Sequence, residues 1–241
     1  MMATVSERVP AHTETRPLLH LAPLAQACLA EGIGTFGLVF AGTGAVISDV
    51  VTGGGVTHVG IALTFGLIIF AMISALGHIS GAHFNPAVTL AFASAGHFPR
   101  RHVLPYIGGQ VTGALAASVL LRALFGNVAR LGATVPHGSD AQSFALEIVL
   151  TFFLMLVITA VATDARAVTR AAAFAIGGTV GLEALFAGPI SGASMNPARS
   201  LAPALVSGDL TSLWLYLVGP VIGALLGAWT YRLLTERIEN P

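Results

Sequence analysis

The sequence predicts an all-α membrane protein with six transmembrane helices and two re-entrant half-helices, arranged as an inverted 3+3 repeat. Three observations support this fold: the composition is very apolar, six segments are long enough to cross a bilayer, and one short motif occurs twice. Of the 241 residues, 55% are hydrophobic and only 9% are charged, whereas soluble domains are about 25% charged. The chain is therefore expected to be an integral, multi-pass membrane protein.

Six stretches reach the roughly 20 apolar residues that a transmembrane helix needs. They lie near residues 22–48, 57–79, 103–125, 143–163, 170–189 and 211–233. The first stretch is too long for the core of a signal peptide, so we expect an uncleaved span. We divide the chain into a polar cytoplasmic tail at 1–20, one membrane domain at 21–235 with repeats at about 21–125 and 143–235, and a C-terminal tail at 236–241.

The shared motif contains an Asn-Pro-Ala turn, once in each half of the chain. Residues 80–91 read SGAHFNPAVTLA, and residues 191–202 read SGASMNPARSLA. Asn is a good N-cap and Pro suits the first helical position, so helices are predicted to begin at Pro86 and Pro197. Each apolar stretch that follows has about ten residues and crosses only half of a bilayer. Irregular backbone at that depth must be buried in protein or line a water-filled path.

The repeat extends beyond the two turns, and this predicts the symmetry of the fold. Glu31 and Thr35 in the first span return as Glu147 and Thr151 in the fourth. Three spans and a half-span therefore occur twice, and because three is odd, the second copy is inserted upside down relative to the first. We expect the two half-helices to meet N-terminus to N-terminus at the membrane midplane.

The placement of arginine predicts which side of the membrane holds the termini. With six spans, one side receives Arg8, Arg16, Arg100, Arg101, Arg166, Arg170, Arg232 and Arg237. Positive residues favour the cytoplasmic side, so both termini are expected there. The short tails suit a plasma membrane, and our interpretation is a bacterial inner membrane.

The paired asparagines are the first candidate functional residues. As N-caps, they use the side-chain oxygen to accept a backbone N–H, which leaves each amide NH2 group as an outward donor. The half-helix N-termini add partial positive charge at the same place. Such a place accepts the oxygen of a neutral molecule and repels cations and protons. Two plain caps are the alternative, but their matched depth favours a pore lined by Asn85, Pro86, Ala87, Asn196, Pro197 and Ala198.

Arg199 lies just after the second turn, whereas the first copy has Val88 at the matching position. A charge within the membrane is costly unless it faces water or a partner. Because the repeat does not require this cation, we expect Arg199 to donate hydrogen bonds at a constriction and to repel cations. A structural ion pair is the alternative.

Three carboxylates lie within the predicted spans. The irregular backbone before each half-helix has N–H groups that need acceptors, so we interpret Glu31 and Glu147 as supports of the two turns. The alternative is a proton relay of a transporter. Glu183 has no counterpart in the first half, and two placements stay open for it: facing the pore vestibule, or hydrogen-bonded to the second turn.

Several functional classes are disfavoured by the sequence. The formal net charge is zero and no basic tract occurs, so nucleic acid is not an expected partner. His78 and His83 flank the first turn without the spacing of metal ligands, so we expect structural or pore-lining histidines and no metal site. No nucleotide-binding loop or paired catalytic carboxylates are evident, so we expect neither an enzyme nor a cofactor.

The two Asn-Pro-Ala turns, the trailing Arg199, the repeated glutamates and the six-span inverted repeat resemble the aquaporin, or major intrinsic protein, family over residues 22–233. The run AGPISGASMN at 187–196 is similar to the nodulin-26-like subgroup, and we expect a bacterial-type member of it. The resemblance implies an aquaporin-like channel domain, a homotetramer with one pore per subunit, and passive two-way flow.

Members of that family have a narrower constriction outside the asparagine pair, built from four positions. The resemblance assigns these positions to Phe65, Ala184, Ala193 and Arg199. Water-selective members typically have His where this chain has Ala184, so the opening is expected to be wider and less polar. Glycerol-conducting members have Asp at the position of Ser200, so a close glycerol facilitator is not expected.

The resemblance therefore implies a passive channel in a lipid bilayer for water and small uncharged solutes such as glycerol and metalloid acids. A strictly water-selective channel is the nearest alternative. An ion-coupled secondary transporter also uses inverted repeats and broken helices, and a non-conducting membrane protein is the third class that we considered.

Overall fold

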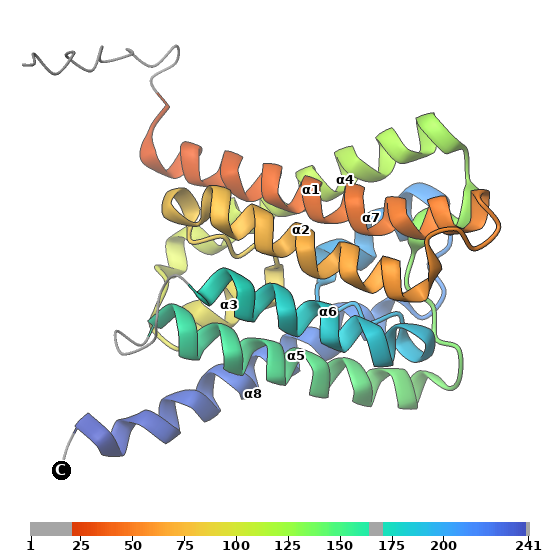
Figure 1. Cartoon of the computed structure of the whole chain (residues 1–241). Coiled ribbons are helices and arrows are strands. Elements are labelled where there is room, and N and C mark those ends of the chain that lie inside the picture. Colours follow the sequence, from red (N-terminus) through yellow and green to blue (C-terminus); the bar gives the residue numbers. More distant parts are fainter. Residues whose placement is uncertain (1–20, 164–170, 240–241) are drawn as a thin grey trace, which may run out of the picture.

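The computed structural model describes residues 21–163 and 171–239, with side chains up to residue 235 (Figure 1). The predicted N-terminal tail at 1–20 lies outside the described residues, as do residues 240–241 of the C-terminal tail predicted at 236–241, the arginines at 166 and 170, and the side chain at 237. The helices are α1 (Pro23–Val51), α2 (Thr57–Ser80), α3 (Pro86–Ser94), α4 (Val103–Phe125), α5 (Asp140–Thr163), α6 (Ala172–Ser191), α7 (Pro197–Ser207) and α8 (Leu213–Glu239), with short 3-10 turns η1 (Arg100–His102) and η2 (Val128–Gly132).

Within the described residues, six helices are long and apolar enough to cross a membrane, and all six match the predicted spans. The all-α fold class is confirmed. Three boundaries differ from the prediction by three residues or more. Helix α1 ends at Val51 rather than near 48. Helix α5 begins at Asp140 rather than near 143, and α8 continues to Glu239 rather than ending near 233, because hydropathy marks where the bilayer ends and not where a helix ends.

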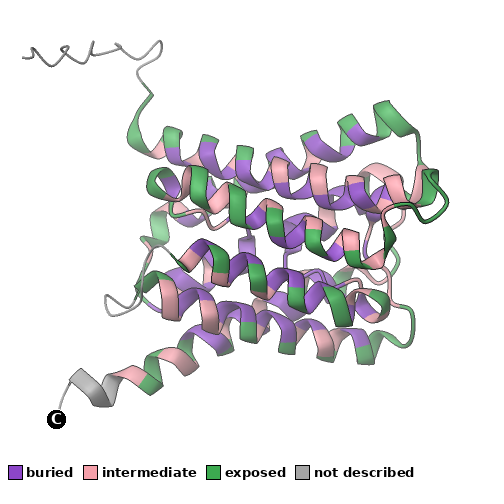
Figure 2. Cartoon of the chain, in the orientation of Figure 1, coloured by how far each residue is buried: buried purple, intermediate pink, exposed green. Residues whose placement is uncertain are grey.

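The two halves of the chain pack in the same way. Helix α1 packs on α2 and α4, and α5 packs on α6 and α8, while α2 against α6 joins the halves. The half-helices cross between the halves, since α3 packs on α8 and α7 packs on α4. Figure 2 shows the buried residues on the inward faces and the exposed residues on the outer faces. The bundle therefore encloses both half-helices.

Glycine allows the first and third helices of each half to touch backbone to backbone. A Cβ atom built on Gly113 of α4 would lie 2.0 Å from the carbonyl oxygen of Gly32. In the second half, a Cβ atom on Gly223 of α8 would lie 2.2 Å from the carbonyl oxygen of Ile148. Any larger side chain would push these helices apart, and small residues serve the same purpose at other membrane-helix interfaces.

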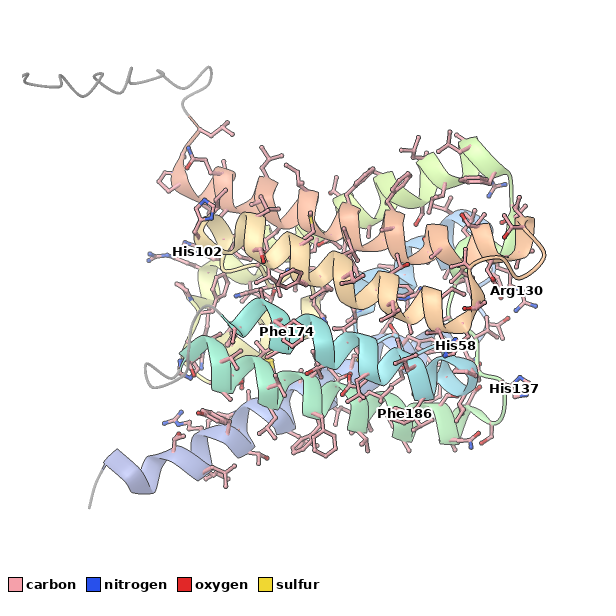
Figure 3. The ribbon with its side chains drawn as sticks, viewed as in Figure 1. His58, His102, Arg130, His137, Phe174 and Phe186 are labelled. Carbon is pink, nitrogen blue, oxygen red and sulfur yellow. The ribbon has the colours of Figure 1, made fainter. Side chains whose placement is uncertain are left out.

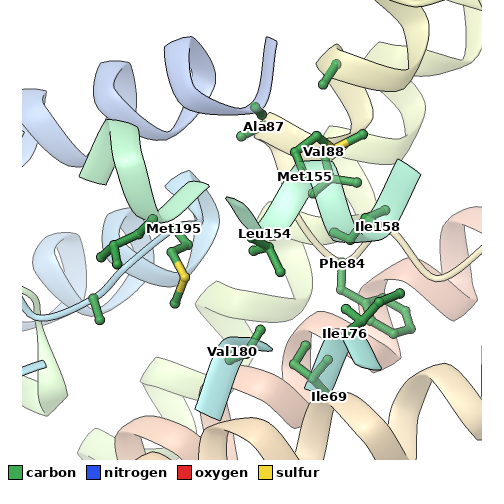
Figure 4. Close-up of a cluster of buried hydrophobic side chains, with 14 of the residues drawn as sticks. Ile69, Phe84, Ala87, Val88, Leu154, Met155, Ile158, Ile176, Val180 and Met195 are labelled. Carbon is green, nitrogen blue, oxygen red and sulfur yellow. The ribbon is translucent and has the colours of Figure 1, made fainter. Parts of the chain in front are cut away.

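One buried apolar cluster surrounds the two turns (Figure 4). Phe84 and Met195, which immediately precede the two asparagines, belong to this cluster together with Ile69, Leu154 and Ile176. The cluster takes side chains from both halves. Packing therefore fixes the turns laterally, while their polar contacts fix the backbone.

Candidate pore and its constriction

The two half-helices begin with the same side-chain cap. The Oδ1 atom of Asn85 accepts a hydrogen bond from the N–H of Ala87 at 2.9 Å. The Oδ1 atom of Asn196 accepts from Ala198 at 3.0 Å and from Arg199 at 3.3 Å. A capping Asn satisfies helix N–H groups that have no intrahelical partner, so the local sequence determines where each half-helix starts.

The amide nitrogens of the two asparagines join the turns to each other. The Nδ2 atom of Asn85 donates to the carbonyl oxygen of Met195 at 2.7 Å, and that of Asn196 donates to the carbonyl oxygen of Phe84 at 2.8 Å. From the sequence, each NH2 group is expected to be a donor toward the pore. In the structure, each group also donates to the other turn. Because a primary amide has two N–H bonds, one from each Asn is used between the turns and one is left for another acceptor.

Glu31 accepts hydrogen bonds from the first turn. Its two oxygens receive the backbone N–H groups of His83 at 2.9 Å and Phe84 at 2.7 Å. They also receive the hydroxyl of Ser80 and the side-chain amide of Gln110, both at 2.7 Å. The carboxylate is fully buried, and these donors occupy most of its acceptor sites.

Glu147 has the matching contacts with the second turn. Its oxygens receive the backbone N–H groups of Ser194 at 2.9 Å and Met195 at 2.8 Å, and the hydroxyl of Ser191 at 2.8 Å. Tyr216 adds a hydrogen bond to the carbonyl oxygen of Ser191 at 2.5 Å. Glu31 and Glu147, which match in the sequence repeat, therefore also make matching hydrogen bonds to the two turns.

The backbone of both turns adopts a conformation that L-residues rarely take. Ala82 and Phe84 have φ angles of 51°, and Ala193 and Met195 have φ angles of 42° and 53°. No cis peptide bond occurs in the described residues, so where an N–H faces a glutamate, the carbonyl of the same peptide points the other way. The peptides bonded to Glu31 and Glu147 thus direct carbonyls away from those side chains, and residues 82–84 and 193–195 line a cavity.

Two cavities lie end to end along this path. The inner cavity, of about 290 Å³, is lined by both asparagines and by mostly apolar side chains. The outer cavity, of about 550 Å³, opens among α2, α6 and η2. Among the residues that the structure describes, the two cavities share four lining residues, Phe65, Ala184, Ala193 and Arg199. These are the four positions that the family resemblance assigns to the constriction.

Arg199 is held at this boundary by its neighbours. Its Nη1 atom donates to the carbonyl oxygen of Gly132 at 2.8 Å, and its guanidinium lies 4.9 Å from the centre of the Phe65 ring. The Nε atom is buried without a hydrogen-bond partner in the described part of the chain. The planar guanidinium has five N–H donors, so donors are available beyond the one that positions it.

The other candidate residues lie in different places. His83 lines the inner cavity, and its Nδ1 atom lies 3.0 Å from the Thr89 hydroxyl. His78 is exposed and lines neither cavity. Glu183 is buried and lines neither cavity, and its Oε2 atom has no hydrogen-bond partner among the residues described. In the same residues no three His, Cys, Asp or Glu side chains gather as metal ligands would.

The sequence analysis missed two groups that hold the site. One is Gln110. It holds the position in the first repeat that Pro220 holds in the second, and this difference between the repeats could have marked Gln110 as a residue with its own role. The other is the carbonyl of Gly132, which follows three residues with φ angles near 50°, Ala129 to Leu131. No pattern of residue types marks that turn, since residues other than glycine seldom adopt this conformation.

Comparison with known proteins agrees with this geometry. The family model described as Major intrinsic protein matches residues 19–231. Aquaporin NIP1-3 from Oryza sativa subsp. japonica is 54% identical over 211 residues, which cover 87% of this chain and 74% of that protein. Nodulin-26 from Glycine max is 47% identical over 213 residues, which cover 88% and 79%.

The solved structures extend this likeness to the fold. The X-ray structure of the aquaglyceroporin from Plasmodium falciparum superposes with a TM-score of 0.79 at 25% identity, and the match covers 89% of this chain and 98% of that one. The two relatives by sequence are plant proteins, and they lend no support to a bacterial source. The chain belongs to the major intrinsic protein family, and it is an integral membrane channel of the aquaporin type rather than an enzyme.

Proposed function

We propose that Phe65, Ala184, Ala193 and Arg199 set the size limit of this channel, which conducts water and small solutes such as glycerol. One observation carries the proposal: these four residues line both the inner and the outer cavity. A solute that passes from one cavity to the other must pass them all.

The chemistry of the four side chains favours small, uncharged solutes that carry oxygen. Two of the four are alanine, which adds little bulk and no hydrogen-bonding group. Arg199 supplies donors on one wall, and its charge opposes cations. Phe65 supplies an apolar face against carbon–hydrogen groups. We extend the proposal to boric and arsenous acids, which are small, neutral at neutral pH and rich in hydroxyl groups.

We assign a second role to the asparagine pair. Each Asn has one N–H left after the bond between the turns, and both amides line the inner cavity next to two half-helix N-termini. Partial positive charge at those termini favours the oxygen of a water molecule and opposes a proton. The pair thus orients a single file of water and helps to exclude protons.

The contacts of the glutamates argue against the coupled transporter. Glu31 and Glu147 accept backbone N–H groups of the turns. A carboxyl group that bound and released a proton in each cycle would break those bonds. We therefore assign both residues to the support of the turns.

The test is stopped-flow light scattering on proteoliposomes, with water, glycerol and urea compared in one preparation. Fast entry of both water and glycerol is expected, and boric acid entry would then be measured with a pH-sensitive dye. Fast water with no solute entry would replace this proposal with a strictly water-selective channel. No flux from correctly folded protein would support a non-conducting role.

The assembly and the orientation are also proposals. We infer one pore in each subunit, because both cavities and the constriction are lined by one chain, and we extend to this chain the homotetramer that the family resemblance implies. Native mass spectrometry would give its size. We place both ends of the chain on the cytoplasmic side of the membrane, because arginine is enriched on that side, and reporter fusions at each end would test that orientation.

A further inference from the structure

The backbone carbonyl of Leu185, near the end of helix α6, lacks the donor that its own helix would normally supply. In an α-helix the N–H of each residue bonds the carbonyl four residues earlier. Pro189 lies inside α6 and has no N–H, so the carbonyl of Leu185 has no helical donor. A backbone carbonyl without a partner is costly within a membrane protein. This carbonyl therefore takes a donor from outside α6, either a side chain of a neighbouring helix or water, since the contact is exposed beside the outer cavity.

His58 of α2 supplies the donor. Its Nε2 atom lies 2.7 Å from the carbonyl oxygen of Leu185. Because a carbonyl can only accept, Nε2 must carry the hydrogen. The ring also packs against Gly188, since a Cβ atom there would lie 2.8 Å from the Cε1 atom of His58. Figure 3 shows His58 between α2 and the end of α6.

The start of α2 is itself held in place. The Oδ1 atom of Asp49 accepts the backbone N–H groups of Val56 at 3.1 Å and Thr57 at 2.7 Å. The backbone that carries His58 is therefore fixed. The bond from His58 to Leu185 consequently links helix α2 to helix α6.

The joined helices carry two of the four constriction residues. Phe65 lies on α2, and Ala184 lies on α6 next to Leu185. On the other side of Phe65, Gly66 approaches α6 so closely that a Cβ atom would lie 2.7 Å from the carbonyl oxygen of Gly177. The constriction thus lies between two fixed contacts of the same helix pair, the glycine contact and the His58 contact.

We propose that His58 is a positioning residue that sets the separation of α2 and α6 at the constriction, and so the largest solute that passes. The inference rests on the proposed role of Phe65 and Ala184 in limiting solute size. It adds that their spacing depends on a histidine that lines only the outer cavity and lies outside the constriction itself.

Four variants test this positioning role in proteoliposomes. His58→Ala removes the bond, and His58→Gln keeps a side-chain N–H that can reach the same carbonyl. Pro189→Ala returns an N–H to α6, so Leu185 no longer needs His58, and the double variant combines it with His58→Ala. Val59→Ala is the matched control, because Val59 is the next residue on α2 and is exposed. The readout is the ratio of glycerol to water permeability.

The expected pattern is specific to the hydrogen bond. His58→Ala raises the ratio about threefold, the factor that an average interhelical hydrogen bond in a membrane protein is worth. His58→Gln and Val59→Ala stay at the wild-type ratio. In the Pro189→Ala background, His58→Ala has no further effect. An unchanged permeability ratio in His58→Ala would overturn the proposal. So would a raised ratio that also appears in His58→Gln and that His58→Ala still causes in the Pro189→Ala background.

A spectroscopic readout separates this inference from the proposed function. In bilayers of protein labelled with 15N-histidine, the signals lost in His58→Gln belong to His58. We expect Nε2 to carry the proton in the wild type and the preference to weaken in Pro189→Ala. A proton on Nδ1 in the wild type would refute the bond. If the wild type passes water but excludes glycerol, the proposed solute range fails, while the nitrogen spectrum still decides the fate of the His58 contact.

Discussion

The two re-entrant turns have the same backbone arrangement but different side-chain supports. In the first turn, the Gln110 amide donates to Glu31 at 2.7 Å and to the Thr89 hydroxyl at 2.9 Å. That hydroxyl also contacts the ring of His83. The first turn is thus tied to α4 by an amide.

The second turn has hydroxyl groups in place of that amide. Pro220 occupies the position that matches Gln110, and it has no side-chain donor. Ser200 instead lies 2.5 Å from the Ser194 hydroxyl and accepts from Thr134 at 2.7 Å. Thr134 comes from the segment after η2, so this additional bond ties the second turn to an outer loop, whereas the additional bond of the first turn comes from α4.

The comparison teaches where a repeat keeps its sequence and where it departs from it. The residues that are the same in both halves, such as Asn85 with Asn196 and Glu31 with Glu147, hold the turns. The residues that differ include Arg199, which lines the constriction, against Val88, which lines the inner cavity. The symmetric residues hold the shape of the turns, and we propose that the asymmetric Arg199 contributes to the selectivity of the channel.

Removal of each repeated carboxylate tests whether the two supports are equal. Glu31→Ala and Glu147→Ala each leave two backbone N–H groups and a hydroxyl without this acceptor, and Glu31→Ala also removes an acceptor of the Gln110 amide, at about 1–3 kcal/mol per group. We expect a loss of stability on the order of 5 kcal/mol in both, measured as the unfolding temperature in detergent. The Gln variants keep one acceptor oxygen and should fall between. A wild-type unfolding temperature in either Ala variant would contradict the assigned support.

Arg199→Val places valine after the second turn, as Val88 follows the first, and so makes the two turns alike at this position. The cationic barrier is lost together with the bond to Gly132. Lowering a barrier by ~1.4 kcal/mol raises a flux about tenfold, and we expect at least that increase in proton leak. The measurement is a trapped pH-sensitive dye under an imposed potential. Arg199→Lys keeps the charge and should keep the barrier. An unchanged proton leak in Arg199→Val would show that the charge of Arg199 does not help to exclude protons.

Ala184→His sharpens the comparison at the constriction, where both Ala184 and Arg199 line the path. The imidazole adds bulk and a donor, so glycerol permeability should fall about tenfold and water permeability less, since pocket size discriminates by such factors. Stopped-flow light scattering measures both. Ala184→Val adds bulk alone and separates size from polarity. Equal losses for water and glycerol would count against the size-limit proposal.

Gln110→Leu tests the first support without touching the constriction. The variant loses two hydrogen bonds of a fully buried amide, for about 1–2 kcal/mol. We expect the unfolding temperature to fall by a few degrees, about 2–4 °C per kcal/mol for a chain of this size, with the water flux unchanged. Ser200→Ala is the counterpart in the second turn. A large loss of flux from Gln110→Leu would place Gln110 in the conducting path.

Asp209→Asn is expected to have the smallest effect. Hydrogen bonds from Thr211 and the nearby Arg130 hold the pKa of Asp209 below its ordinary value. Such a group contributes stability above its unfolded pKa and loses it only as the pH falls through the lowered value. Between pH 8 and pH 5 its ion pair with Arg130, at 3.2 Å, should therefore add no pH dependence. The pair is exposed, and exposed pairs contribute little, so the unfolding temperature should match wild type within about 1 °C.

How much the sequence could predict depends on the kind of contact. The six spans and the starts at Pro86 and Pro197 follow from hydropathy and from capping chemistry, both of which are local. The bonds from Asn85 to Met195 and from His58 to Leu185 end on backbone carbonyls. Every residue has such a carbonyl, so no residue type marks the partner, and only the folded arrangement identifies it.

The reciprocal bonds between the turns also constrain how the chain is made. Asn85 and its acceptor on Met195 are 110 residues apart. During synthesis the first half enters the bilayer well before that acceptor exists, and until then one amide hydrogen of Asn85 and the carbonyl of Phe84 lack their final partners. The first turn therefore reaches its final form only when the second half inserts beside it, so the conducting path cannot mature one half at a time.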